Sequence, residues 1–305
     1  MSIIRPPALR PGDTVGVVAL AAAADGAGVE RGAAALREMG YRVKFSPHVL
    51  DRAGILAGVD SLRARELTAF FRDPEVKAVF GARGGYGSGR LLPLLDFAEL
   101  ARTPKIFVGF SDATFVLNAL VDYSRMVSFH GPMVATDLAR GLSQHSRAHL
   151  QRLLGGTQGL ELQAAEALRV GQAEGTLIGG CLSIIVAMMG TPWQLGFEGR
   201  ILFLEDTGEK PYRIDRMLVQ MRQAGVFDRV AGIVFGALRP PLESGPAEQA
   251  QIAEFVAEQI AGVNCPVLWG IEAGHGSDNL TLPLGTRVQL DSKQRRMVLL
   301  EAAVS

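Results

Sequence analysis

The chain has 305 residues, of which 48% are hydrophobic and 20% charged, so it can bury more than one compact core. Its 31 basic and 31 acidic side chains balance, which argues against nucleic acid or an anionic membrane as a partner and favours a small molecule. Cys181 and Cys265 are far apart and form no CxxC motif, so neither a disulfide framework nor a structural zinc site is expected. This cysteine usage fits a reducing compartment such as the cytoplasm.

Strand-like and helix-like runs alternate along the first half of the chain. Strands are expected at 14–20, 42–45, 76–80, 105–108 and 126–129, and helices near 28–39, 61–71, 88–100, 112–123 and 145–154. Such alternation predicts a mostly parallel sheet that helices cover on both faces. The apolar run Thr14–Gly26 also has features of an export signal, but Asp13 and the prolines before it favour a first buried strand.

The second half repeats this alternation after a glycine-rich segment. Strands are expected at 201–204, 230–235 and 266–269, helices near 211–224 and 247–261, and a hairpin over 287–290 and 296–300. The segment 156–172 has no strong period and is predicted to link a domain over 1–155 to a domain over 173–305.

Ser111 stands at the corner between an apolar strand and a helix, in the sequence Gly-Phe-Ser-Asp-Ala. A serine on a tight strand–turn–helix corner is exposed at the carboxyl end of a sheet, where it can act as a nucleophile. The small residues Gly109 and Ala113 allow this turn to close. The alternative is an ordinary N-cap.

The loop Phe80–Arg90 supports the nucleophile interpretation, because an acyl-transfer enzyme must offer backbone N–H groups to an oxyanion. Gly84 and Gly85 are the natural donors, together with the N–H of Asp112. A phosphate cradle is disfavoured because the glycine spacing matches neither GxxxxGK[ST] nor GxGxxG. A purely structural loop remains an alternative.

A serine nucleophile needs a base and a group that orients it. Among the five histidines, His275 lies between two glycines after an apolar run, where α/β active sites assemble. Glu205 and Asp206 end another apolar strand; neighbours on a strand point to opposite faces, so only one can address the histidine. The pattern alone does not choose between them. His145 and His149 share a helix face, but the chain has Ser146 where HExxH requires Glu, so no metal site is expected.

Motifs over nearly the whole chain carry a family resemblance: GDTVGVVA, RGGYGSGRLLPLLDF, KIFVGFSDAT, FHGPM, GTLIGGCLS, LFLEDTGEKPYRIDRML, GIVFG and GHGSDNLTLPLG. In these motifs the chain resembles the LD-carboxypeptidases, serine peptidases that include the microcin C immunity peptidases. The resemblance implies a triad of Ser111 as nucleophile, Glu205 as orienting acid and His275 as general base.

The resemblance also implies a fold. It consists of an N-terminal three-layer α/β/α domain, like that of class I glutamine amidotransferases, and a smaller C-terminal α/β domain with a β-sheet or barrel. The active site would lie between the domains.

The implied reaction releases the terminal D-alanine from the murein tetrapeptide L-Ala-D-Glu-diaminopimelate-D-Ala during peptidoglycan recycling, through an acyl-enzyme and without a metal or other cofactor. The expected partner is therefore a small peptide, with no nucleic acid and no membrane, and a homodimer is a further expectation because relatives often form one.

Two departures from the family pattern leave the fine specificity open. The chain has Ala21–Ala24 where relatives commonly carry Ala-Pro-Ser, and Cys181 where they often carry Asn. Alternatives are a microcin-immunity-type amidase acting on aminoacyl nucleotide analogues, and a non-catalytic peptide-binding protein.

A carboxypeptidase must also recognise a free carboxylate, a task that suits the planar fork of arginine. Arg83 and Arg213 lie closest in sequence to the expected site, and Tyr86 and Tyr212 could add hydroxyl groups. The alternative for Arg213 is an exposed position on a helix that Pro211 opens.

Overall fold

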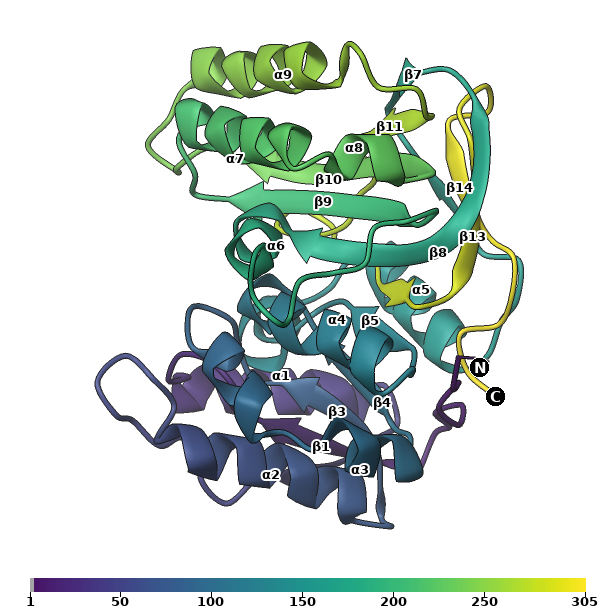
Figure 1. Ribbon diagram of the computed structural model, residues 1–305. Helices are drawn as coiled ribbons and strands as arrows, with labels where there is room; N and C mark the ends of the chain where they lie inside the picture. Colours follow the sequence, from purple (N-terminus) through teal and green to yellow (C-terminus); the bar gives the residue numbers. More distant parts are fainter. Residues whose placement is uncertain (1–2) are drawn as a thin grey trace. The chain divides into compact units, whose positions relative to one another are not determined.

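The computed structural model describes residues 3–305, which divide into two compact units (Figure 1). Unit 1 comprises Met1–Gln158, Asn279–Gly285 and Ala302–Ser305, and unit 2 comprises Gly159–Asp278 and Thr286–Glu301. The units are therefore discontinuous in sequence, whereas the predicted division used one cut. Short C-terminal segments join unit 1 because they pair or pack with its N-terminal elements.

Unit 1 contains a six-stranded sheet in the order β12-β5-β4-β3-β1-β2. Its strands are β1 (Thr14–Val18), β2 (Arg42–Phe45), β3 (Val76–Gly81), β4 (Ile106–Gly109), β5 (Ser128–His130) and β12 (Leu282–Leu284). The first five are parallel, as predicted, and β12 pairs antiparallel with β5. Both β1 and β4 are buried along their whole length, which explains their uninterrupted apolar runs.

Helices cover both faces of this sheet, which gives the predicted three layers (Figure 1). They are α1 (Gly26–Glu38), α2 (Asp60–Arg72), the 3-10 helix η1 (Ser88–Leu94), α3 (Phe97–Arg102), the 3-10 turn η2 (Ser111–Ala113), α4 (Thr114–Tyr123), the π-helical turn η3 (Val134–Leu138) and α5 (Gln144–Leu154). The single helix predicted over 88–100 is wrong: Pro93 lies inside η1, and the Asp96 side chain begins α3 by accepting from Glu99 N at 2.9 Å.

Unit 2 contains an eight-stranded sheet in the order β6-β14-β13-β8-β9-β10-β11-β7. The strands are β6 (Glu161–Gln163), β7 (Glu166–Arg169), β8 (Gln172–Cys181), β9 (Ile201–Thr207), β10 (Gly232–Arg239), β11 (Val267–Trp269), β13 (Arg287–Asp291) and β14 (Arg296–Leu299). The central strands β8, β9, β10 and β11 are parallel, and the predicted hairpin of β13 and β14 is present. The segment 156–172, predicted as a linker, differs: it forms β6 and β7 on the two edges of this sheet.

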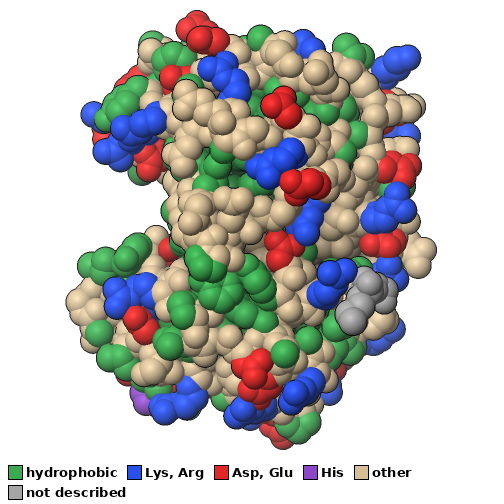
Figure 2. Space-filling model, in the orientation of Figure 1, with side chains coloured by type: hydrophobic (Ala, Val, Ile, Leu, Met, Phe, Trp, Pro, Cys, Tyr) green, Lys and Arg blue, Asp and Glu red, His purple; other side chains and the backbone are tan. Residues whose placement is uncertain are grey.

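The helices of unit 2 are α6 (Leu182–Met188), α7 (Pro211–Gln223), α8 (Val226–Arg229) and α9 (Pro246–Ile260), and α7 packs against α9 (Figure 1). Among the described residues, no helix has the length and hydrophobicity that crossing a membrane requires. Figure 2 shows basic and acidic side chains interspersed over the visible face of each unit, in keeping with the balanced composition.

Candidate active site

Ser111 lies directly after β4, in the turn η2 that leads into α4. Its φ of +58° falls in the left-handed region, which is uncommon for a residue other than glycine. A Cβ on Gly109 would lie only 3.0 Å from the Ala113 Cβ, so the turn closes tightly because both residues are small. The predicted strand–turn–helix corner is thus present, with strained backbone at the serine itself.

The glycine loop after β3 approaches this serine closely. A Cβ added to Gly84 would lie 2.8 Å from the Ser111 Cβ and 2.9 Å from its Oγ, so a side chain at Gly84 would collide with Ser111. In residues 3–305 no hydrogen bond engages the N–H of Gly84 or Gly85. This geometry is compatible with the predicted oxyanion-binding role of the loop.

Asp112 fixes the far end of the same loop through its side chain. The buried carboxylate accepts hydrogen bonds from Gly87 N at 3.2 Å and Ser88 N at 2.7 Å, and Ser88 Oγ donates to the Asp112 carbonyl at 2.5 Å. The sequence predicted only a backbone N–H from Asp112. The structure adds a carboxylate that couples the residue after Ser111 to the glycine loop.

Asp112→Asn is expected to lower kcat by about 10- to 100-fold, less than direct loss of an oxyanion donor typically costs. The amide has one acceptor oxygen, so its NH₂ would face a backbone N–H and loosen the loop. Steady-state kinetics should show the loss in kcat with KM little changed, together with weaker binding of a peptide boronate that mimics the tetrahedral intermediate.

Ser88→Ala is the matched control for Asp112→Asn, because it removes only the hydroxyl bond and leaves both carboxylate bonds in place. A folded Asp112→Asn enzyme with wild-type kcat and wild-type boronate affinity would show that the carboxylate does not position the loop.

Glu205 and His275 form a second group of candidate catalytic residues, within unit 2. Glu205 lies near the end of β9 with 0% exposure, and its Oε2 accepts from His275 Nδ1 at 2.7 Å and from His275 N at 3.0 Å. A Cβ on Gly274 would collide with that Oε2, so only glycine admits the carboxylate there. With Nδ1 as the donor, the neutral ring carries an unprotonated Nε2, the form that a general base requires.

Asp206 has a different environment from its neighbour. Its carboxylate accepts from Ser183 N at 2.7 Å and from Thr207 N at 2.8 Å, both within unit 2. Burial, with the nearby Glu205 charge as a further cause, raises the pKa of Asp206 to about 6. The carboxylate that contacts His275 is therefore that of Glu205, the residue that the family resemblance implied.

The four predicted substrate-binding residues have varied surroundings. Arg83 is half-buried and donates to the Ala23 carbonyl at 3.3 Å, and Tyr86 is exposed on the glycine loop. Tyr212 and Arg213 are exposed in the first turn of α7, where Arg213 contacts both Tyr212 and Glu209 at 3.4 Å. The Arg213 guanidinium is thus already partnered.

The histidine pair on α5 differs in burial. His149 is buried, and its Nε2 lies 2.8 Å from the Thr281 carbonyl oxygen. Burial lowers the pKa of His149, which favours the neutral ring. Its Nε2 is therefore hydrogen-bonded within unit 1.

Comparison with known protein families shows to which family the chain belongs. The family model of the LD-carboxypeptidase N-terminal domain matches residues 15–131, and that of the LD-carboxypeptidase C-terminal domain matches residues 174–290. The chain belongs to the LD-carboxypeptidase family. It is therefore a serine-type carboxypeptidase, which sets aside the non-catalytic peptide-binding alternative.

Three relatives show how far this likeness extends. A probable murein peptide carboxypeptidase of Bacillus subtilis strain 168 is 36% identical, covering 99% of this chain and 95% of that protein. The crystal structure of muramoyltetrapeptide carboxypeptidase from Oxalobacter formigenes superposes with a TM-score of 0.84 at 32% identity, covering 94% and 97% of the two chains. The microcin C7 self-immunity protein MccF of Escherichia coli is 25% identical over 97% of this chain and 96% of its own.

Proposed function

We propose that this LD-carboxypeptidase releases the terminal D-alanine from the murein tetrapeptide L-Ala-D-Glu-diaminopimelate-D-Ala in peptidoglycan recycling. Two relatives whose names refer to murein or muramoyl peptides match nearly the full chain and support the substrate. The observation that carries the proposal is the 2.7 Å contact between Glu205 and His275, because it orients an imidazole as a general base.

The proposed first half-reaction forms an acyl-enzyme. The Ser111 Oγ attacks the carbonyl carbon of the L–D peptide bond while its proton passes to Nε2 of His275. The N–H groups of Gly84 and Gly85, with that of Asp112, would donate to the oxyanion. The C–N bond then breaks, His275 gives its proton to the departing D-alanine amine, and an ester on Ser111 remains.

The second half-reaction hydrolyses the acyl-enzyme. His275 takes a proton from water, the resulting hydroxide attacks the ester, and collapse of the tetrahedral intermediate releases the shortened peptide as a carboxylate. The proton on His275 then returns to the Ser111 oxygen. Glu205 stabilises the imidazolium in both steps. The proposal requires Ser111, from unit 1, and His275, from unit 2, to share a proton during turnover.

A second candidate is a serine amidase acting on aminoacyl nucleotide analogues. The observation in its favour is the match to MccF along almost the whole chain, although at 25% identity. The murein peptide is preferred because the relatives at higher identity carry that substrate in their names. The cytoplasm as the compartment and a homodimer as the assembly stay predictions.

Mass spectrometry of two separate incubations tests this choice. With the murein tetrapeptide, we expect a product shorter by one alanyl residue together with free D-alanine, whereas the same peptide ending in L-alanine should react more slowly. With an aminoacyl sulfamate of adenosine, the amidase candidate instead predicts release of the amino acid. An intact tetrapeptide beside a cleaved sulfamate would contradict the preferred function.

A further inference from the structure

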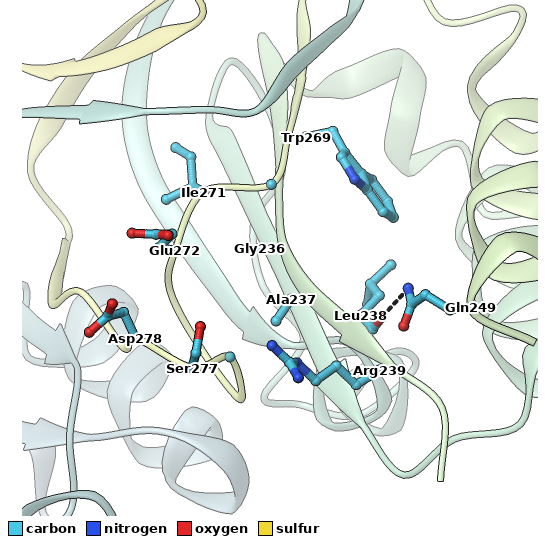
Figure 3. Close-up of a pocket in the computed structure, with 12 residues that line it drawn as sticks. Gly236, Ala237, Leu238, Arg239, Gln249, Trp269, Ile271, Glu272, Ser277 and Asp278 are labelled. Carbon is cyan, nitrogen blue, oxygen red and sulfur yellow. Dashed lines mark hydrogen bonds between the residues drawn. The ribbon is translucent and has the colours of Figure 1, made fainter. Parts of the chain in front are cut away.

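A pocket of about 440 Å³ lies in unit 2 beside the loop that carries His275 (Figure 3). Residues at the ends of β10 and β11 line it, and so does Gly276, the residue after His275. Pockets at the carboxyl ends of parallel strands are the usual ligand sites of α/β sheets. The pocket is thus one residue away from the proposed general base, and no step of the proposed reaction uses it.

Arg239 is the one cationic side chain among the residues that line this pocket. It is the exposed last residue of β10, and its carbonyl accepts from Gly208 N at 2.9 Å, which fixes its backbone. In the described part of the chain its guanidinium has no hydrogen-bond or ion-pair partner. Figure 3 shows the guanidinium pointing toward the loop that carries Ser277. An exposed guanidinium that lines a pocket and has no protein partner can bind a carboxylate through two parallel hydrogen bonds.

Another part of the lining is apolar and held in place. The Trp269 ring packs against Phe235 with centroids 5.6 Å apart, and the buried Leu238 also lines the pocket. Gln249 Nε2 donates to the Leu238 carbonyl at 2.9 Å, which ties α9 to the end of β10. This wall offers a rigid surface for the aliphatic part of a ligand.

Two acidic residues, Glu272 and Asp278, also line the pocket and would repel an anion if they faced its cation. Figure 3 shows both carboxylates pointing away from Arg239. The charge next to the apolar wall is therefore the positive charge of Arg239.

We propose that this pocket binds a carboxylate of the peptide substrate, with Arg239 as the residue that determines this specificity. The inference rests on the proposed function, because it takes the ligand to be a murein peptide. Such a peptide offers carboxylates of two sources, the terminal one and those of its side chains. Arg239 replaces Arg213 as the preferred candidate, since Arg213 already contacts Glu209.

The test measures peptide binding by calorimetry in a Ser111→Ala background, where turnover does not interfere. Adding Arg239→Ala should weaken tetrapeptide binding by about 10- to 100-fold, the range expected for a hydrogen-bonded charge pair, and Arg239→Lys should restore part of the loss. Arg222→Ala, which removes an exposed arginine in the last turn of α7, is the matched control and should bind within about twofold of the parent.

Three further peptides identify the source of the carboxylate. Each is amidated at one carboxylate: the terminal one, the free one of the D-glutamate residue, or the side-chain one of the diaminopimelate residue. The peptide that lacks the contacted group should bind equally well to the parent and to the Arg239→Ala variant, so its identity names the source. If Arg239→Ala leaves tetrapeptide binding unchanged, the inference about Arg239 is overturned and the proposed substrate stands. If the parent does not bind the tetrapeptide, the proposed substrate is contradicted as well.

Discussion

Ser111→Ala is expected to lower kcat for the murein tetrapeptide by on the order of 10⁶, the loss seen when a triad nucleophile is removed. The hydroxyl oxygen forms the acyl-enzyme ester, and alanine offers no atom that could replace it. Because Ser111 already has a φ of +58°, alanine meets the same backbone strain and the fold should persist. The measurement is D-alanine release under saturating peptide, with a thermal melt to verify folding.

Ser61→Ala provides the control for Ser111→Ala, because Ser61 is an exposed serine on α2 and should leave kcat unchanged. Removal of a triad nucleophile costs far more than a factor of about 100 in kcat. A Ser111→Ala preparation that keeps more than about one hundredth of wild-type kcat would therefore rule out Ser111 as the nucleophile.

Glu205→Gln is expected to lower kcat by roughly 10⁴, as in triads whose orienting carboxylate becomes an amide. Glu205 Oε2 accepts from both Nδ1 and the backbone N of His275, and the side chain is fully buried. An amide NH₂ turned toward the ring would favour the tautomer with Nδ1 as acceptor, which places the proton on Nε2. That ring cannot take a proton from Ser111. Steady-state kinetics with the tetrapeptide measures the effect.

Asp206→Asn is the matched control, since it neutralises the adjacent buried carboxyl, which contacts Ser183 N and Thr207 N instead of His275. We expect its kcat within about tenfold of wild type, far from the loss expected when the orienting carboxylate becomes an amide. Equal losses in the two variants would indicate a general electrostatic effect of this strand end and argue against a specific role of Glu205.

Local signals predicted much of the fold and of the candidate site. Apolar runs identified β1 and β4 because both are buried on two faces, and the alternation of elements predicted the parallel sheet of unit 1. Small residues around Ser111 predicted its tight turn, and the glycines of the loop Phe80–Arg90 predicted a backbone that can closely approach an oxyanion at the nucleophile. Each of these signals comes from residues that are neighbours in the sequence.

The remaining features depend on contacts between distant segments. The three-residue strand β12 carries Pro283 at its centre and gives no strand signal of its own, yet it pairs with β5. The segments β6 and β7 are short and partly polar, so only their pairing partners define them. The Asp112 carboxylate acts on residues 24 and 25 positions away, a separation that no local pattern records.

The sequence contains a weak indication that Arg239 is a candidate substrate-binding residue. Arg239 is a lone cation at the carboxyl end of the apolar run Gly232–Arg239, the same kind of position that drew attention to Glu205 and Asp206. The sequence did not show that the pocket forms there, because its walls come from β11, α9 and the loop after β11. Distance along the chain from Ser111 and Glu205, which pointed to Arg83 and Arg213, therefore did not point to Arg239.

The central claim is that His275 activates Ser111, and the rate of covalent modification of Ser111 by a fluorophosphonate measures this directly. Wild-type protein should be labelled at Ser111, as located by peptide mass spectrometry, and His275→Ala should slow that labelling by roughly 10²- to 10⁴-fold, the usual contribution of a general base. Labelling of Ser111 at the same rate in both proteins, or labelling of a different residue, would contradict the account.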